Sequence, residues 1–263
     1  MPRITMRADN LNERNAEFAQ APLKHPIFLN SVPKCGTHLV RNVMRMFVPV
    51  PQQYHTAFIQ IPLLRQHGHA LSPDKPMLSW GHLLFSDDSA ILTRRTRHIL
   101  MVRDPYDWVL ARARFFLSEN FDGMTENLKR GGADVNDILN MMIFGIHGKA
   151  PNMEEIFRFN AAAWLGTTTF LIRYEEMVAH LKKLDSKESE LYFARLFHAC
   201  GIDVPADWRE RVRVGSDRKQ SATARENLQA DALELPDELP DVQKRLVNYA
   251  APGLRELLGY GPR

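Results

Sequence analysis

The sequence predicts a single α/β domain with a mainly parallel central sheet flanked by helices. The first supporting observation is that short apolar runs alternate with longer segments whose apolar residues recur every three or four positions. The second is that several runs are apolar at every position, which is typical of strands buried on both faces of a parallel sheet. We assign residues 25–263 to this domain and treat the polar residues 1–24 as a loose N-terminal lead-in.

Composition agrees with that class. The 263 residues are 44% hydrophobic and 25% charged, which supplies ample material for a buried core. The net charge of +3 suits an anionic ligand but is too small to indicate nucleic-acid binding. The two cysteines, Cys35 and Cys200, cannot form a disulfide framework, and no signal peptide or membrane-length apolar stretch is visible. We therefore expect a cytoplasmic protein without a membrane partner, and the sequence indicates no particular oligomeric state.

The domain begins with a strand, a tight turn and a helix. Residues 27–29 form an apolar run, and Pro33 and Gly36 interrupt regular structure after it. Apolar residues then recur at helical spacing, at Leu39, Val40, Val43, Met44 and Phe47. Pro49 and Pro51 end this helix.

The later elements continue the alternation. Further strands are expected over residues 77–84, 98–103 and 168–174. Helices are expected over residues 87–94, 105–117, 138–146, 154–165, 191–200 and 239–258. The helix at 105 has a well-marked start, because Asp104 can be its N-cap, Pro105 suits its first position and Asp107 can complete a capping box. Residues 214–225 lack periodicity but are rich in cations and hydroxyls, so we expect a loop able to meet an anion.

The turn after the first strand holds the first candidate site. A strand, a turn and a helix in succession point backbone N–H groups and the positive end of the helix dipole at one spot. Lys34 adds a full charge there and Thr37 adds a hydroxyl, which indicates a phosphate or sulfate ligand. The turn is not a Walker A loop, because its lysine precedes Gly36 instead of following a glycine. The alternative is an ordinary strand-to-helix turn with a surface lysine.

Three more polar side chains end or follow predicted strands: His82, Arg103 and Tyr174. Ligands of open α/β sheets bind beyond the carboxyl ends of the strands, so we expect these side chains and Lys34 to converge. A histidine accepts protons near neutral pH, which makes His82 a candidate general base. The alternative is a hydrogen-bonded core histidine.

Four stretches follow one another in a set order along the chain. They are Pro-Lys-Cys-Gly-Thr at 33–37, Ser-Trp-Gly-His-Leu at 79–83, Arg-Asp-Pro-Tyr-Asp at 103–107 and Leu-Ile-Arg-Tyr-Glu-Glu at 171–176. This set resembles the sulfotransferase family, and the resemblance spans most of the chain. It implies a P-loop NTPase-like fold with 3′-phosphoadenosine 5′-phosphosulfate as donor. It also implies transfer of the sulfuryl group to a hydroxyl or amine of an acceptor.

The resemblance implies roles for individual residues. Lys34 would stabilise the leaving phosphate and His82 would be the general base. The donor would be bound by Lys34, Cys35, Gly36, Thr37, His38, Arg103, Tyr174, Arg218 and Lys219. Among these, Arg103 would hold the 3′-phosphate and Tyr174 would lie near the adenosine. The reaction requires no metal ion, and we predict none.

The sequence departs from the family's pattern at several of these positions. His38 replaces the second threonine of the loop, and Leu39 stands where cytosolic members carry a tryptophan that stacks on adenine. Ala111 replaces a serine that helps to hold the 3′-phosphate, and Trp80 replaces a lysine. Nearby residues that could compensate include Arg112 and Arg114.

Two rival classes stay open. A P-loop nucleotide kinase or NTPase shares the strand, turn and helix with a lysine, although the missing Gly-Lys-Ser/Thr order argues against it. A catalytically inactive nucleotide-binding protein would hold the same nucleotide and transfer nothing. For the acceptor, the aromatic and Met residues between Phe115 and Trp164 favour a small molecule of apolar or amphipathic character.

Overall fold

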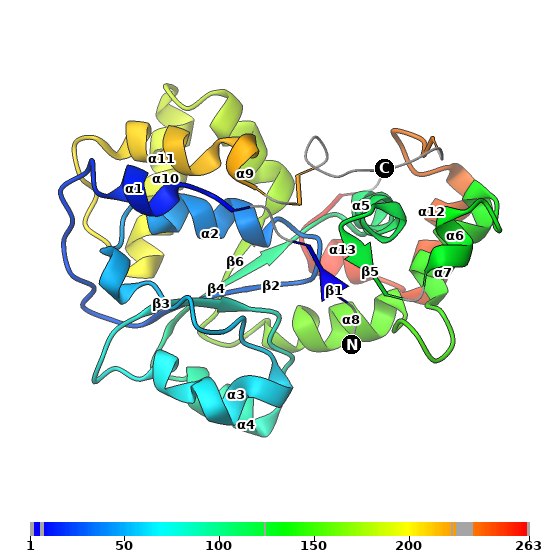
Figure 1. The fold of residues 1–263 in the computed structure, drawn as a ribbon, viewed down its shortest axis with the longest axis horizontal. Coiled ribbons are helices and arrows are strands. Elements are labelled where there is room, and N and C mark those ends of the chain that lie inside the picture. The colour runs from blue at the N-terminus through cyan, green and yellow to red at the C-terminus, as the bar shows by residue number, and fades with distance from the viewer. Residues whose placement is uncertain (1–2, 6–7, 124, 222, 225–233, 262–263) are drawn as a thin grey trace.

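A four-stranded parallel sheet forms the centre of the molecule (Figure 1). Its strands are β2 Ile27–Ser31, β3 Leu78–Gly81, β4 Arg97–Val102 and β6 Phe170–Arg173, in the spatial order β3-β2-β4-β6. Ile27 of β2 pairs with Leu78 on one side and with Arg97 on the other. The computed structural model describes residues 3–5, 8–123, 125–221, 223–224 and 234–261.

Burial explains the apolar runs of the sequence. Every residue of β2 and β3 is buried, and in β4 only Arg97 is exposed. Strands covered on both faces need apolar or hydrogen-bonded side chains at successive positions, not at alternate ones. The predicted α/β class and its parallel sheet are therefore confirmed.

Helices surround the sheet. The α-helices are α1 Leu11–Asn15, α2 Thr37–Arg45, α3 Ile61–His67, α4 Asp87–Thr93, α5 Pro105–Leu117, α6 Glu126–Lys129, α7 Val135–Phe144, α8 Met153–Asn160, α9 Tyr174–Lys182, α10 Lys187–Cys200, α11 Trp208–Ser216, α12 Asp241–Ala250 and α13 Leu254–Leu257. The 3-10 helices are η1 Val50–Gln52, η2 Gly68–Leu71, η3 Ala162–Trp164 and η4 Arg218–Gln220. A short antiparallel pair joins β1 Arg3–Ile4 to β5 Phe121–Asp122.

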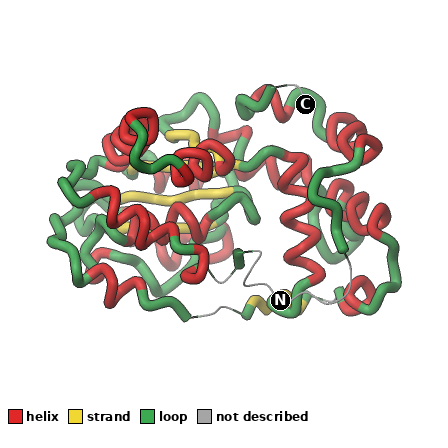
Figure 2. Tube along the Cα trace, turned by 90° about the horizontal axis from the view of Figure 1, so that it is seen from above, coloured by secondary structure: helices red, strands yellow, loops and turns green. Residues whose placement is uncertain are grey.

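The helices fall into three groups. In Figure 1, α2, α9, α10 and α11 lie on one side of the sheet, and α3 and α4 lie on the opposite side. A third group, which includes α5, α7 and α12, stands beyond one end of the sheet, as the view from above also shows (Figure 2). This end is the carboxyl end of the strands, because Trp108 of α5 donates its indole N–H to the carbonyl O of Pro33 just after β2 (2.6 Å).

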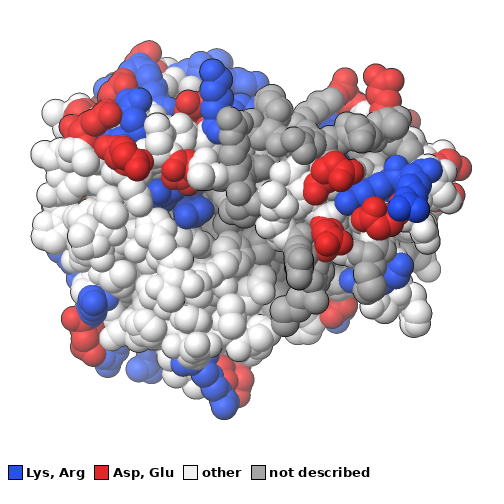
Figure 3. All heavy atoms as spheres, viewed as in Figure 1, with Lys and Arg blue, Asp and Glu red and all other residues white. Residues whose placement is uncertain are grey.

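The outer surface carries charges of both signs. Figure 3 shows basic and acidic side chains intermingled at the edges of one face, with a largely uncharged area between them. Such mixing accords with the small net charge of +3. No helix in the described part of the chain is both long enough and apolar enough to cross a membrane.

The described residues of the N-terminal segment, 3–5 and 8–24, include regular structure that the sequence does not predict. The strand pair β1–β5 ties the N-terminal segment to the chain after α5. Within α1, Leu11 belongs to the core and is fully buried. This helix has only five residues, which is too short for apolar periodicity to reveal. The division into a lead-in and a domain beginning at residue 25 stays a prediction.

The structure corrects two expectations near the C-terminus. The single helix expected over residues 239–258 is two helices, α12 and α13, because Pro252 and the left-handed Gly253 (φ 71°) interrupt it. The loop expected over residues 214–225 begins inside α11 and contains η4. Ala222 and Arg225, which belong to that expectation, lie outside the described residues.

Candidate functional site

The turn between β2 and α2 has an unusual backbone. Trp108 fixes its first residue through the hydrogen bond to Pro33. Lys34 then adopts a left-handed φ of 69°, which is uncommon for a residue with a Cβ atom. Gly36 has a φ of 101°, and a Cβ atom there would lie 2.5 Å from Cδ2 of Tyr174, so only glycine fits. The turn thus packs closely against Tyr174, the first residue of α9.

The first turn of α2 faces the same place. The N–H groups of Leu39 and Val40 both donate to the carbonyl O of Gly36, at 2.9 and 3.2 Å. The N–H groups of Thr37 and His38 precede these first intrahelical bonds. With the helix dipole, these N–H groups have the arrangement that binds anions at helix N-termini, and an anion site here stays a prediction.

The side chain of Lys34 lies in surroundings that disfavour its positive charge. Its Nζ lies 3.5 Å from the centroid of the Phe115 ring, and the side chain is half-buried. Burial lowers the pKa of Lys34 to about 7, and the positive charge of Arg103 acts in the same direction. Near neutral pH a fraction of the side chain is therefore uncharged, and an anion bound beside it would favour the charged form.

His82 follows β3 and contacts β2. Its Nδ1 lies 2.7 Å from the carbonyl O of Ser31, which can only accept, so Nδ1 carries the proton and Nε2 the lone pair. The hydroxyl of Ser31 lies 3.3 Å from the same Nδ1 and 2.5 Å from Oγ1 of Thr37. Ser31 thus connects the histidine to the first turn of α2.

Burial keeps the His82 ring neutral. Burial lowers the pKa of His82 to about 4, with the charge of Lys34 acting in the same direction and the hydrogen bonds to the backbone of Ser31 and Gly81 opposing it. At neutral pH the ring is uncharged, which is the form that can accept a proton. The alternative prediction, a hydrogen-bonded core histidine, shares this geometry, so the base role stays a prediction.

Arg103 and Tyr174 form a second part of the site. The guanidinium carbon of Arg103 lies 4.6 Å from the centroid of the Tyr174 ring, and its Nε lies 3.9 Å from Oε1 of Glu175. This Nε is buried and has no hydrogen bond within the described residues. A cleft of about 360 Å³ adjoins it, with charged lining residues Arg103, Asp107, Glu175, Lys182 and Lys183.

A buried ion pair fixes the backbone beside Arg103. Arg255 of α13 donates to both carboxylate oxygens of Asp104, at 3.0 and 2.9 Å, and the two side chains are 4% and 0% exposed. Glu175 accepts the N–H of Asp104 (3.1 Å) and the hydroxyl of Tyr260 (2.8 Å). The C-terminal segment therefore holds the strand end that presents Arg103.

Sequence reasoning missed a cation beside Trp80 and His38. Arg41 of α2 stacks on Trp80, with its guanidinium carbon 4.1 Å from the ring centroid, and its buried Nε has no hydrogen-bond partner in the parts of the chain described. Burial lowers the pKa of Arg41 to about 10, so it stays charged at neutral pH. Burial and the charge of Arg41 also lower the pKa of His38, to about 3. The one signal in the sequence was Trp80 itself, which stands where the resemblance implies a lysine.

The two arginines that could compensate for the serine missing at Ala111 both form hydrogen bonds to backbone carbonyl groups. Arg112 is buried and donates to the carbonyl O atoms of Met142 and Pro151, both at 2.8 Å. Arg114 donates to the carbonyl O of Pro236 (3.1 Å). These bonds join the helices beyond the sheet end.

The other predicted donor-binding residues lie on either side of α2. Cys35 is fully buried, and burial raises the pKa of its thiol well above the ordinary value, so it is packing material and not a nucleophile. Arg218 and Lys219 lie in η4, which contacts α2 where Asn42 donates to the carbonyl O of Gln220 (3.2 Å). Their approach to a ligand stays a prediction.

The structure thus brings the predicted residues to one edge of the sheet. Thr37 and His82 contact Ser31, and Lys34 lies in the turn just before α2. Tyr174 lies beside Gly36 and is contacted by Arg103. Among the described residues, no group of three or more His, Cys, Asp or Glu side chains is placed to hold a metal ion.

Comparison with solved structures identifies this architecture. No protein-family model matches the chain, and no curated protein matches it in sequence. The crystal structure of mouse sulfotransferase SULT7A1 complexed with PAP matches 97% of this chain and 94% of its own, with a TM-score of 0.59 and 17% identity. The chain has a sulfotransferase fold. At this identity the likeness concerns the fold alone, and the predicted P-loop-like sulfotransferase architecture is confirmed in that sense.

Proposed function

We propose that this protein is a sulfotransferase that moves the sulfuryl group of 3′-phosphoadenosine 5′-phosphosulfate to a hydroxyl or amine of a small acceptor. The observation that carries the proposal is the placement of a neutral His82 at the sheet edge that also carries Lys34: Ser31 joins His82 to Thr37 in the first turn of α2, and Lys34 is close enough to lower the pKa of His82. In-line transfer needs a cation where the leaving phosphate gains charge and a base where the acceptor loses a proton. The sulfotransferase fold adds support.

In the proposed reaction, the acceptor oxygen or nitrogen attacks the sulfur as the bond from sulfur to the bridging phosphate oxygen breaks. The electron pair of that bond leaves on the phosphate, where Lys34 and the first N–H groups of α2 stabilise it. Nε2 of His82 takes the proton of the acceptor. The products are the sulfated acceptor and 3′-phosphoadenosine 5′-phosphate (PAP).

The remaining predicted residues would hold the donor. Arg103, whose buried Nε has no hydrogen bond within the described residues, is proposed to bind the 3′-phosphate, with Tyr174 beside the adenosine. The backbone of Cys35, Gly36 and His38 would surround the 5′-phosphosulfate. Arg218 and Lys219 would approach from η4.

The donor would also tune the base. A pKa of about 4 makes His82 a weak base in the free protein. A phosphosulfate bound at Lys34 places negative charge nearby and offsets the repulsion by the lysine, which raises the pKa of the histidine. We propose that this shift moves His82 towards the range in which a general base is most effective.

The acceptor is proposed to be a small apolar or amphipathic molecule. The ring of Phe58 meets the His82 ring edge-on, with 4.6 Å between centroids, which gives the acceptor side an apolar wall. A cytoplasmic location is proposed because both cysteines, Cys35 and Cys200, are buried free thiols.

Thermal unfolding with PAP, and in parallel with ATP and magnesium, tests the nucleotide site. A ligand that binds only the folded protein raises the unfolding midpoint. We expect a rise with PAP alone. A rise with ATP and magnesium alone would favour the kinase or NTPase class, and no rise with either would contradict a nucleotide site at Lys34.

Transfer is tested separately, with donor labelled in its sulfuryl group and a panel of hydroxyl and amine acceptors. Formation of labelled product by the parent protein, but not by a Lys34→Ala variant, would support the proposal. PAP binding without transfer to any acceptor would favour the inactive nucleotide-binding protein, for which the departures at Leu39 and Ala111 are the supporting observation.

A further inference from the structure

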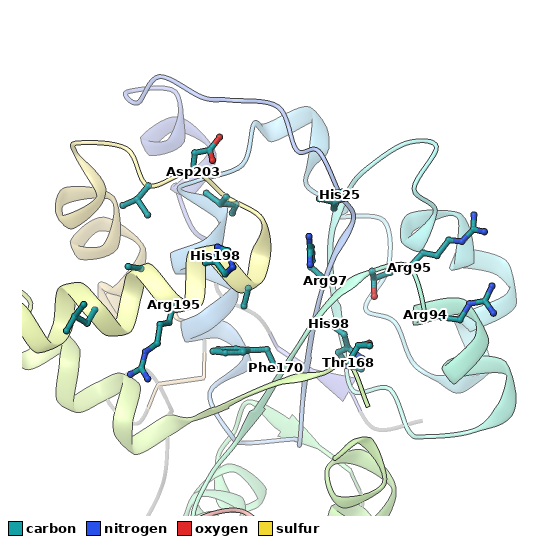
Figure 4. Close-up of a pocket in the computed structure, with 16 residues that line it drawn as sticks. His25, Arg94, Arg95, Arg97, His98, Thr168, Phe170, Arg195, His198 and Asp203 are labelled. Atoms are coloured by element: carbon teal, nitrogen blue, oxygen red, sulfur yellow. The ribbon is translucent and has the colours of Figure 1, made fainter. Parts of the chain in front are cut away.

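We propose that the chain has a second ligand site, for an amphipathic organic anion, at the opposite edge of the sheet. A cleft of about 950 Å³ opens there (Figure 4). Its lining includes His25 before β2, Arg97 at the start of β4 and Phe170 at the start of β6. Lys34 and Arg103 follow the carboxyl ends of the same strands. The cleft is therefore separate from the candidate active site, and the inference does not rest on the proposed function.

The cleft concentrates positive charge that has no partner. It is lined by four arginines, Arg94, Arg95, Arg97 and Arg195. Within the described residues none of these side chains forms an ion pair or a hydrogen bond, and the one lining carboxylate, Asp203, pairs with Lys24 at 3.0 Å. Unpaired like charges around one hollow repel each other, so a bound anion would be stabilised there.

These arginines come from separate elements that line the cleft. Figure 4 shows Arg94 and Arg95 on the turn before β4, Arg195 on α10 across from them, and Arg97 on the strand between. A Cβ atom added at Gly201 would lie 3.6 Å from Nε of Arg97 and 3.4 Å from Cδ2 of His25. The side chain of Arg97 thus passes close to the turn that ends α10.

One wall of the cleft is apolar. It consists of Phe170 and of side chains from α10 and the turn after it, namely Leu191, Ala194, Ile202 and Val204. Leu191 and Val204 are 57% and 47% exposed, so this apolar surface faces solvent. An inorganic anion would leave the wall uncovered, whereas a ligand with an apolar body and an anionic end matches both walls.

The floor holds a buried polar atom without a partner. His98 lines the cleft, is 3% exposed and places its Nδ1 3.2 Å from Oγ1 of Thr169. Its Nε2 is buried and has no hydrogen bond among the residues described. An unsatisfied buried nitrogen costs free energy, so this edge of the cleft has an unmet hydrogen-bonding requirement.

Isothermal titration with octyl sulfate tests the site, because this probe joins an apolar chain to one anionic group. We expect one binding site. Arg97→Gln and Arg195→Gln should each raise the Kd of octyl sulfate by about tenfold, because each variant loses one charge-assisted hydrogen bond. Val204→Gln should also weaken it, because the apolar wall loses a contact. Arg65→Gln is the matched control, since Arg65 is exposed, lies outside the cleft and pairs with Asp88.

Two further probes measure how much the apolar wall and the arginines each contribute to binding. Sodium sulfate lacks the apolar chain and octyl glucoside lacks the charge, so both should bind more weakly than octyl sulfate. Thermal unfolding of each variant checks that it is folded. Equal octyl sulfate affinity in the parent, Arg97→Gln and Arg195→Gln would overturn the proposal. Displacement of the probe by PAP, one for one, would overturn it as well, because it would place the probe at the nucleotide site.

Discussion

His82 is the residue on which the proposed chemistry depends most. His82→Gln removes the ring nitrogen that would accept the proton but keeps a side-chain amide able to donate to the carbonyl O of Ser31. We expect turnover to fall by about 10²–10⁴, the usual contribution of a general base, while PAP affinity stays within about twofold. Initial rates and calorimetric titration measure the two quantities. Unchanged turnover would remove His82 from the mechanism.

Lys34 predicts a pH dependence of nucleotide binding. Its pKa in the free protein is lowered to about 7 by burial and by Arg103, whereas a bound anion favours the charged ammonium and raises that pKa. Below pH 7 the lysine is already charged and affinity should be level. Above pH 7 binding must take up a proton, so the Kd of PAP should rise by up to about tenfold for each pH unit.

Titration of PAP between about pH 6 and pH 9, in two buffers of different ionisation enthalpy, measures this proton uptake. Lys34→Met is the matched control, because it keeps the stem of the side chain and should flatten the profile. A parent protein that binds PAP equally well across this range, with no proton taken up, would show that Lys34 does not touch the ligand.

The convergence of the candidate residues could be predicted because it depends on strand ends. Lys34, His82, Arg103 and Tyr174 follow parallel strands, and parallel strands end at one edge of a sheet. Ser31 could not be predicted, because only the pairing of β2 with β3 and the path of the next turn bring it to His82. Contacts between residues distant in sequence leave no local signal.

Among the elements, those with strong local signals were predicted best. The start of α5 is one example, because Asp104 caps it as expected, accepting the N–H of Tyr106 at 3.0 Å. The runs that became β2 and β4 are buried on both faces and so are apolar throughout. In contrast, α1 depends on the helices that cover Leu11 and not on its own five residues.

The junction between α5 and α13 gives a stability prediction. Arg255→Met leaves the buried carboxylate of Asp104 without its cation, which typically costs about 3–5 kcal/mol of unfolding free energy. Urea unfolding measures this loss. Arg65→Met, which breaks an exposed pair with Asp88, is the control and should cost no more than about 1 kcal/mol. A loss at Arg255 as small as that of the control would show that the pair is not desolvated.

At the scale of the whole molecule, the C-terminal segment closes the carboxyl edge of the sheet. Arg255 of this segment pairs with Asp104, and the carbonyl O of Gly259 accepts a hydrogen bond from Nη1 of Arg173 at the end of β6 (2.5 Å). A chain ending at Gly253 should therefore unfold at a lower temperature and lose PAP affinity, because Arg103 is no longer held in place. A chain ending at Tyr260 keeps these contacts and should resemble the parent in both measurements.

The contacts of the C-terminal segment with the sheet can form only late in biosynthesis, after the four strands have been made. A chain growing from its N-terminus has all four strands, and Lys34, His82 and Arg103 with them, long before Arg255 is made. Until then the strand end that presents Arg103 lacks its contacts with Arg255 and Tyr260. Nucleotide binding should therefore appear only once α13 has been made, and nascent chains stalled before α13 should bind little nucleotide even where their sheet has formed.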